Sequence, residues 1–142
     1  MSVKSVQFAV AAHIMAALAY HHGEEISSAT LSESVNADPT FVRKSLSKLS
    51  KAGLVVTKRG KSGASMLSRS PRQITLLDIY RASGAPPAFA IHSYPADKRC
   101  PVSCNLKECM AGVLSQTQYS FERSLAKITL AGLVGHIREK AQ

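Results

Sequence analysis

The apolar residues in the N-terminal third of the chain recur at helical spacing. Residues 2–20 are apolar nearly all round, which is typical of a helix at the centre of a core. A His-His-Gly sequence ends this helix. Residues 28–35 predict a short helix with Leu31 and Val35 as its apolar contacts. A tight connection at 36–37 then leads into a third helix.

The clearest periodicity in the chain lies in this third predicted helix, residues 39–53. Val42, Leu46 and Leu49 follow one another at i, i+4 and i+7, so they share one face. Three lysines repeat that spacing two residues further on, about 200° around the helix axis. Asp38 is a natural N-cap, and a proline follows at the first helical position. A short helix, a tight turn and a capped basic helix together predict a helix-turn-helix.

A β-hairpin is predicted directly after this helix. Residues 54–57 are a β-type run, residues 58–63 are a turn rich in glycine and positive charge, and residues 66–68 are the return strand. The basic tip suits contact with a phosphate or a minor groove, so we interpret the hairpin as a wing. A sequence resembling a capping box at 75–78 then starts a helix that ends near Gly84.

A break at Ala85-Pro86-Pro87 divides the chain into two predicted regions. Residues 1–84 are expected to form a winged helix-turn-helix DNA-binding domain, and residues 85–142 a sensor loop and dimerisation helices. The second region predicts a long helix over 105–126 with an apolar face. Such a helix needs a partner, and a second subunit supplies one. The predicted fold class is mainly α with a small β-hairpin wing: a winged helix-turn-helix plus a long C-terminal dimerisation helix.

The positive charge is concentrated in the predicted DNA-binding region. The chain of 142 residues has a formal net charge of +9, and nine of its 18 lysines and arginines lie between residues 39 and 77, which hold no Asp or Glu. Basic and acidic residues balance elsewhere, so this stretch marks a surface for a polyanion. The helical pattern favours double-stranded DNA over a membrane, because membrane binding usually pairs a basic face with an exposed apolar one on a long amphipathic helix.

The cysteines and the N-terminal apolar run bear on the compartment. Three cysteines is an odd number, and all three lie between residues 100 and 109, unlike the disulfide framework of a secreted domain. The apolar run at 8–19 is interrupted by a histidine and is too short to span a bilayer. We therefore expect a cytoplasmic protein with reduced thiols and no membrane partner.

The residues expected to contact DNA lie at the start of the third helix and on the wing. The N-terminal residues of a recognition helix usually contact bases, and Arg43 is placed either to read a guanine or to bind a phosphate. Ser28 is expected to cap the preceding helix and meet a phosphate, and Phe41 is expected to pack. The candidate set is Ser28, Pro39, Thr40, Phe41, Arg43, Lys44, Lys48, Lys58, Arg59, Gly60 and Lys61.

Cys100, Cys104 and Cys109 form the other candidate site, and three interpretations stay open. In the first, the thiols are a redox switch activated by Lys98, Arg99 and a helix N-terminus, and the disulfide joins Cys100 to Cys104 or links two subunits. In the second, they hold a 2Fe–2S or 4Fe–4S cluster with a fourth ligand from elsewhere. In the third, they are small apolar residues at a dimer interface. The thiol switch, which needs no cofactor, is the working hypothesis.

Several motifs together resemble the Rrf-two (Rrf2) family of bacterial winged-helix regulators. The matching stretches are 38–44 (DPTFVRK), 49–55 (LSKAGLV), 59–63 (RGKSG), 67–71 (LSRSP), 74–79 (ITLLDI) and 128–134 (ITLAGLV). The resemblance implies that the basic helix enters the major groove, that the wing contacts the minor groove or backbone, and that the long helix crosses its counterpart in a homodimer. Cluster-binding relatives carry three cysteines in this region at longer spacings. The residues around Cys100 are similar to the YwnA-like branch, which is not known to bind a cluster.

The sequence thus predicts a homodimeric, sequence-specific DNA-binding regulator, expected to be a repressor acting on a near-palindromic operator, with a cysteine-based redox or thiol-responsive region. The alternative within the family is a regulator that senses an iron–sulfur cluster or another metal. A DNA binder with no sensor is a further alternative. A cysteine-dependent redox enzyme is disfavoured, because the chain has no Cys-x-x-Cys, nucleotide-binding loop or paired acid–base site. We therefore predict no enzyme activity and no catalytic residues.

Overall fold

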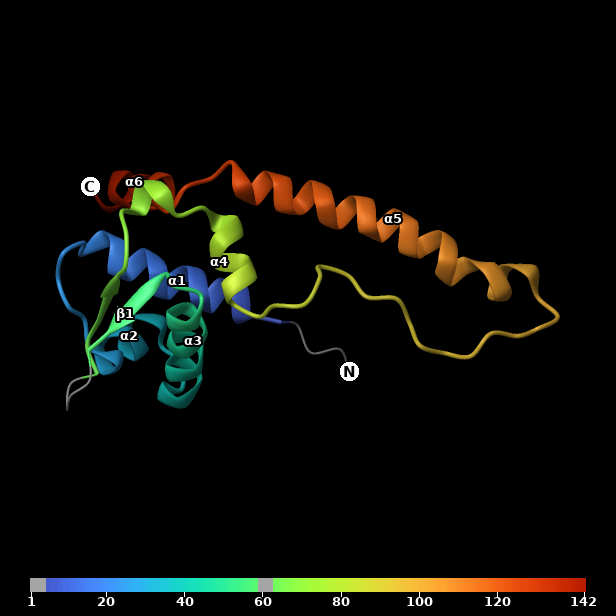
Figure 1. Cartoon of the computed structure of the whole chain (residues 1–142), viewed down its shortest axis with the longest axis horizontal. Helices are drawn as coiled ribbons and strands as arrows, with labels where there is room; N and C mark the ends of the chain where they lie inside the picture. Colours follow the sequence, from blue (N-terminus) through green and yellow to red (C-terminus); the bar gives the residue numbers. More distant parts are fainter. Residues whose placement is uncertain (1–4, 59–62) are drawn as a thin grey trace. The chain divides into compact units, whose positions relative to one another are not determined.

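The computed structural model describes residues 5–58 and 63–142. The chain divides into unit 1, residues 1–85 and 125–142, and unit 2, residues 86–124. The elements in chain order are α1 (Gln7–Tyr20), α2 (Ser28–Val35), α3 (Pro39–Lys51), β1 (Val55–Thr57), β2 (Ser65–Leu67), η1 (Pro71–Gln73), α4 (Leu76–Ala82), α5 (Pro101–Ala126) and α6 (Leu130–Ala141) (Figure 1). This mainly helical fold with one small antiparallel hairpin confirms the predicted fold class.

Helix α1 lies at the centre of the unit 1 core, as its apolar pattern predicts. Its buried side chains, which include Ile14, Ala16 and Leu18, extend around more than half of the helix circumference. The helix packs against α2, α3, α4 and α6. The helix begins at Gln7. The prediction, which started it at residue 2, was therefore wrong for residues 5 and 6, which are not helical. The residues before these lie outside the described range.

Helices α2 and α3 form the predicted helix-turn-helix. Asn36 between them has a left-handed backbone (φ 60°), which permits the tight turn. Asp38 caps α3 as predicted, because its Oδ1 accepts the backbone N–H of Thr40 at 2.7 Å. The start of α2 corrects the prediction. Ser27, whose backbone is extended, is the N-cap and its Oγ accepts a backbone N–H at 3.1 Å, whereas Ser28 is the first helical residue.

The predicted hairpin forms from strands β1 and β2, which pair antiparallel with Val55 opposite Leu67. The end of the hairpin next to the turn is tied to the rest of unit 1. Ile26 and Ser65 exchange two backbone hydrogen bonds of 2.8 and 2.9 Å, which join β2 to the segment just before α2. The wing and the helix-turn-helix therefore share a backbone connection besides the covalent chain.

Helix α4 begins with the predicted capping box. The Asp78 N–H donates to Thr75 Oγ1 at 3.1 Å, and the Thr75 N–H donates to Asp78 Oδ2 at 2.9 Å. The same segment anchors the last helix, because the Leu130 N–H donates to the Ile74 carbonyl at 2.8 Å. Helix α6 therefore belongs to unit 1, although the sequence-based division at residue 84 assigned it to the second region. The functional assignment of the two regions stays a prediction.

Unit 2 consists of an extended segment, residues 86–99, and most of α5 (Figure 1). The segment is bound to the helix by side-chain hydrogen bonds. The Ala88 N–H donates to Gln118 Oε1 at 3.0 Å, and Lys107 Nζ donates to the Tyr94 carbonyl. Within unit 2 no side chain is buried. The two units thus differ sharply in how far they remove apolar surface from water.

Helix α5 is longer than predicted. It begins at Pro101, four residues before the expected start. Proline suits the first turn of a helix because its φ is fixed and the N–H that it lacks would have no helical partner. As a result, Cys104 and Cys109 lie within the helix and Cys100 immediately precedes it. No helix in the described part of the chain is long and apolar enough to cross a membrane.

Candidate nucleic-acid interface and cysteine segment

Helix α3 has a buried apolar face and an exposed polar face, as its periodicity predicts. The buried face consists of residues that are at most 6% exposed and that belong to the unit 1 core, namely Val42, Leu46 and Leu49. Thr40, Lys44 and Lys51 are exposed on the opposite side. Arg43 is also exposed, and its Nη2 donates to Thr40 Oγ1 at 3.4 Å. The core contacts therefore hold the helix while its first turns present polar side chains to solvent.

A hollow of about 470 Å³ lies between α3, the start of α2 and the base of the wing. The side chains around it are mostly hydroxyl-bearing or basic: Ser28, Arg43, Ser47, Ser50, Lys51 and Thr57. Such groups are the usual donors to phosphate oxygens. The fold thus brings the predicted residues Ser28 and Arg43 to one site. Sequence reasoning missed Ser47 and Ser50, which lie at i+4 and i+7 from Arg43, and it missed Thr57, for which no local pattern existed.

The other flank of α3 carries Phe41, Lys44 and Lys48, which line a second hollow of about 290 Å³. The Lys48 ammonium lies against Gly84, where a Cβ would come within 3.2 Å of Nζ. Gly84 follows the last turn of α4, and the C-terminal end of a helix dipole favours a nearby cation. The predicted phosphate contact of Lys48 therefore competes with a contact inside unit 1. Phe41 is half-buried, as its expected packing role requires.

The start of the wing's turn carries an ion pair that the sequence did not reveal. Lys58 Nζ lies 2.5 Å from Glu25 Oε1, and the two side chains are 67% and 38% exposed. The two residues are far apart in the sequence and meet only because β2 pairs with the segment before α2. The other candidate wing residues, Arg59, Gly60 and Lys61, lie outside the described residues.

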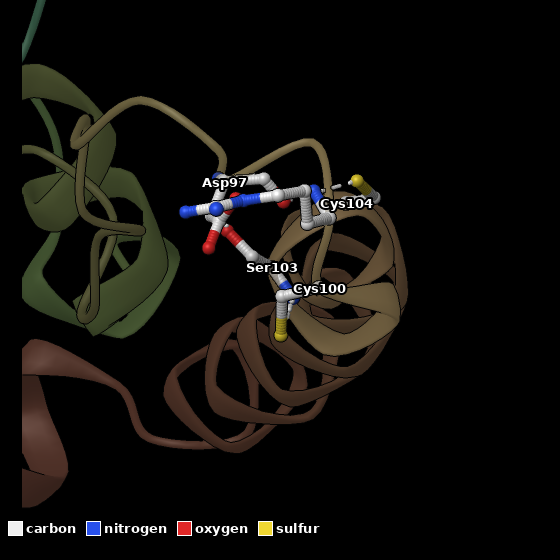
Figure 2. A network of polar contacts seen from close by, with 5 residues as sticks. Asp97, Cys100, Ser103 and Cys104 are labelled. Carbon is white, nitrogen blue, oxygen red and sulfur yellow. Dashed lines mark hydrogen bonds and ion pairs between the residues drawn. The ribbon is translucent and has the colours of Figure 1, made fainter.

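Cys100 lies at the N-terminal boundary of α5, where it acts as a capping side chain. Its Sγ accepts a hydrogen bond from the backbone N–H of Ser103 at 3.4 Å. Asp97 completes the arrangement. Its N–H donates to Ser103 Oγ at 2.7 Å, and its carbonyl accepts the Cys104 S–H at 3.5 Å (Figure 2). The end of the extended segment is thereby fastened to the first turn of the helix.

All three cysteines are free thiols, Cys100 half-buried and Cys104 and Cys109 exposed. The sulfur atoms of Cys100 and Cys104 point to different sides of the helix start (Figure 2). Arg99, which was expected to activate the thiols, pairs with Asp97 at 3.4 Å. In the described part of the chain, no group of three or more His, Cys, Asp and Glu side chains is placed to hold a metal ion.

Comparison with known proteins relates these features to a family. The model of the Rrf2 family, described as an iron-dependent transcriptional regulator, matches residues 4–136. YwnA of Bacillus subtilis (strain 168), named as an HTH-type transcriptional regulator, is 33% identical over 132 residues, which cover 92% of this chain and 96% of YwnA.

Solved structures of regulators have the same fold. IscR of T. potens matches with a TM-score of 0.74 at 25% identity, over 100% of this chain and 92% of IscR. CymR of B. subtilis, described as its global cysteine regulator, matches with a TM-score of 0.68 at 23% identity, over 96% of this chain and 98% of CymR. Because the family consists of regulators, the prediction that the protein is not an enzyme is confirmed. The resemblance inferred from the motifs is also confirmed: the chain belongs to the Rrf2 family of DNA-binding transcriptional regulators.

Proposed function

We propose that this protein is a homodimeric, sequence-specific repressor that places α3 in the major groove of DNA. The observation that carries this proposal is the pair of opposite faces on α3. The apolar face fixes the helix to the core, and the other face directs Thr40, Arg43 and Lys44 into solvent. In helix-turn-helix proteins the N-terminal residues of the recognition helix contact base edges. Such a repressor acts in the cytoplasm, where its thiols stay reduced.

The contacts around α3 support separate roles for its residues. The planar Arg43 guanidinium can bind O6 and N7 of a guanine, and the Thr40 hydroxyl beside it limits its freedom. Ser28 and Lys51 line the neighbouring hollow and suit phosphate contacts. Pro39 and Phe41 set the start of the helix. The lysines and wing residues are proposed as backbone contacts, namely Lys44, Lys48, Lys58, Arg59, Gly60 and Lys61.

The exposed face of α5 supports a homodimer. Val102, Leu106 and Val113 are 66%, 43% and 54% exposed, and their spacing of i, i+4 and i+11 places them on one face of the helix. A second copy of the chain can cover this apolar face with its own. A two-fold dimer would then present two α3 helices to the two half-sites of a near-palindromic operator.

The cysteines support a thiol switch that acts on the start of α5. One molecule of hydrogen peroxide takes two electrons and two protons from two thiols, which leaves a disulfide and two molecules of water. Because the Cys100 and Cys104 sulfurs point apart, a bond between them would require the first turn of α5 to rearrange. Exposed Cys104 or Cys109 would instead link two subunits. Either bond changes the start of α5 in the predicted sensor region.

The iron dependence in the family description favours one alternative, an iron–sulfur cluster at the same cysteines. Within the described residues of one chain the thiols are not gathered as a ligand set, so the arrangement does not fit a cluster and we derive no step through one. An ultraviolet–visible spectrum of anaerobically purified protein, with iron, sulfide and thiol counts, separates the two sensors. Visible charge-transfer bands with stoichiometric iron would establish the cluster. A colourless, iron-free protein with reactive thiols would favour the thiol switch.

Selection of operators from random double-stranded DNA, followed by affinity measurements, tests the DNA-binding proposal. We expect a near-palindromic sequence and binding that weakens steeply with salt. Arg43→Ala should reduce the preference for the operator over scrambled DNA by about tenfold or more. Lys51→Ala, a phosphate-contact control, should weaken both DNAs alike. If Arg43→Ala leaves affinity and preference intact, α3 does not dock as proposed.

A further inference from the structure

Unit 2 contains a cavity of about 530 Å³ between the extended segment and α5. Pro87, Phe89 and Ile91 line it from the segment, and the facing wall of α5 includes Leu114 and Tyr119. Cavities of this size hold drug-sized molecules. A smaller hollow of about 150 Å³ adjoins it and shares the side chains of Ile91 and Leu114. The two hollows form one apolar groove along α5.

The larger cavity is on a different face of α5 from the stripe proposed for the dimer, whereas the smaller hollow is bordered by Leu106 of that stripe. Viewed down the helix, Val102, Leu106 and Val113 lie within about 40° of one another, whereas Leu114 and Gln118 lie about 100–140° away from Val113. Hydrogen bonds hold the segment over this second face at two points. Gln118 Oε1 accepts the Ala88 N–H at 3.0 Å, and Lys107 Nζ binds a carbonyl further along. The extended segment and α5 therefore form the two walls of the groove, and these hydrogen bonds hold the walls together.

The chemistry of the larger cavity is aromatic at the sides and acidic at one end. Phe89 and Tyr119 provide two aromatic rings, and Glu122 is the one formally charged side chain among the described residues that line it. Glu122 is half-buried and accepts a hydrogen bond from Gln118 Nε2 at 3.4 Å. Arg123, one helical turn further on, lies over the Tyr119 ring at 5.7 Å, which is a cation–π distance.

We propose that this cavity binds a flat, apolar organic cation, of the class of aromatic amines and dyes with a delocalised positive charge. The rings of the ligand would lie against Phe89, Leu114 and Tyr119, where apolar burial and cation–π attraction act together. Its charge would face the Glu122 carboxylate, which a half-buried site screens less than bulk water does. An anion of the same shape would be repelled at the same end. This ligand site goes beyond the proposed repressor function and does not depend on it.

The test is a titration of the full chain with rhodamine 6G, followed by fluorescence anisotropy without DNA. Fluorescein, which shares the flat ring system but is anionic, is the matched ligand. We expect saturable binding of one rhodamine 6G per chain and at least about tenfold weaker binding of fluorescein. Because DNA is absent, the result stands apart from the success or failure of the repressor proposal.

Glu122→Gln should weaken rhodamine 6G binding by about tenfold, because it removes the charge and keeps the shape. Glu108→Gln is the matched control: it removes the same charge from the same helix at a position that lines neither hollow. Leu114→Trp, which fills the groove from a half-buried site, should abolish binding while circular dichroism shows an intact helix content. Absence of saturable binding, equal affinity for fluorescein, or equal effects of the two Glu→Gln variants would overturn the proposal.

Discussion

The two units of the chain differ in how far they bury their apolar side chains. Unit 1 removes most of its large apolar side chains from water: Ile14, Leu49 and Ile79, for example, are 0% exposed. In unit 2 no side chain is buried, and Val102, Val113 and Tyr119 are all more than half exposed. Both units are built from helices, so the difference lies in packing partners and not in secondary structure.

This contrast indicates which properties each unit can have alone. The helices of unit 1 pack against one another, so their positions are fixed before any ligand arrives, and α3 is preorganised for the DNA contact proposed for it. A single long helix with an extended segment has few contacts to fix it. Its exposed apolar faces would gain free energy if a second copy or a ligand covered them. A sensor benefits from that property, because a small chemical change can then shift its state.

The largest predicted effect is a difference between the units in how much a truncated leucine lowers the free energy of unfolding. Leu49→Ala leaves a cavity in the unit 1 core and should lower the free energy of unfolding by about 2–5 kcal/mol. Leu106→Ala in unit 2 deletes the same atoms from a side chain that is already 43% exposed, and should cost far less in dilute protein. Urea unfolding followed by circular dichroism gives both values. Equal losses would mean that unit 2 contributes to a common core.

Local signals explain how much could be predicted from the sequence. The cap at Asp38, the apolar face of α3 and the capping box at Thr75 depend on residues within one or two turns, and the structure confirms each of them. The prediction began α5 at residue 105, next to Leu106, and overlooked Pro101 and Val102, which carry the helix-start and apolar signals in its first turn. The candidate DNA contacts and sensor cysteines remain predictions.

Contacts between distant segments could not be predicted. The pair of Lys58 and Glu25 exists only because strand β2 pairs with the chain before α2. The place of α6 in unit 1 follows from hydrogen bonds between the Ile74 and Leu130 regions, which no periodicity encodes. The groove over α5 also depends on where the extended segment lies. All three features require pairing information that a single sequence does not contain.

The second prediction sharpens the contrast by asking what covers α5. Val113→Asp places a charge on the exposed apolar stripe and should weaken self-association by at least about tenfold, because burying an unpaired carboxylate is costly. Gly112→Asp adds the same charge about 100° around the helix, where a Cβ meets nothing within 4 Å, and should have little effect. Sedimentation equilibrium measures both variants. If both remain dimers, the stripe is not the interface.

The third prediction concerns unit 2 as a sensor. Hydrogen peroxide should lower the operator affinity of the wild type by about fivefold or more, within the usual range of coupling between sites. Replacing Cys100, Cys104 and Cys109 together by Ser should remove this response and leave the affinity of the reduced protein unchanged. Fluorescence anisotropy with labelled operator measures both, and dithiothreitol should restore the wild type. An unchanged peroxide response in the triple variant would exclude the cysteines as the sensor.

The smallest predicted effect concerns an ion pair on the surface of unit 1. Glu25 holds Lys58 at 2.5 Å, so a DNA phosphate must compete with this carboxylate for the lysine. Glu25→Gln should therefore strengthen binding to operator and scrambled DNA alike, by about two- to fivefold at low salt, since exposed pairs are weak. Glu24→Gln is the control, because it removes the same charge without touching Lys58. The Glu24 carboxylate lies 3.6 Å from Nδ1 of His21 instead. The gain from Glu25→Gln should shrink to that of Glu24→Gln in a Lys58→Ala background, and equal gains in the wild-type background would show that net charge alone is at work.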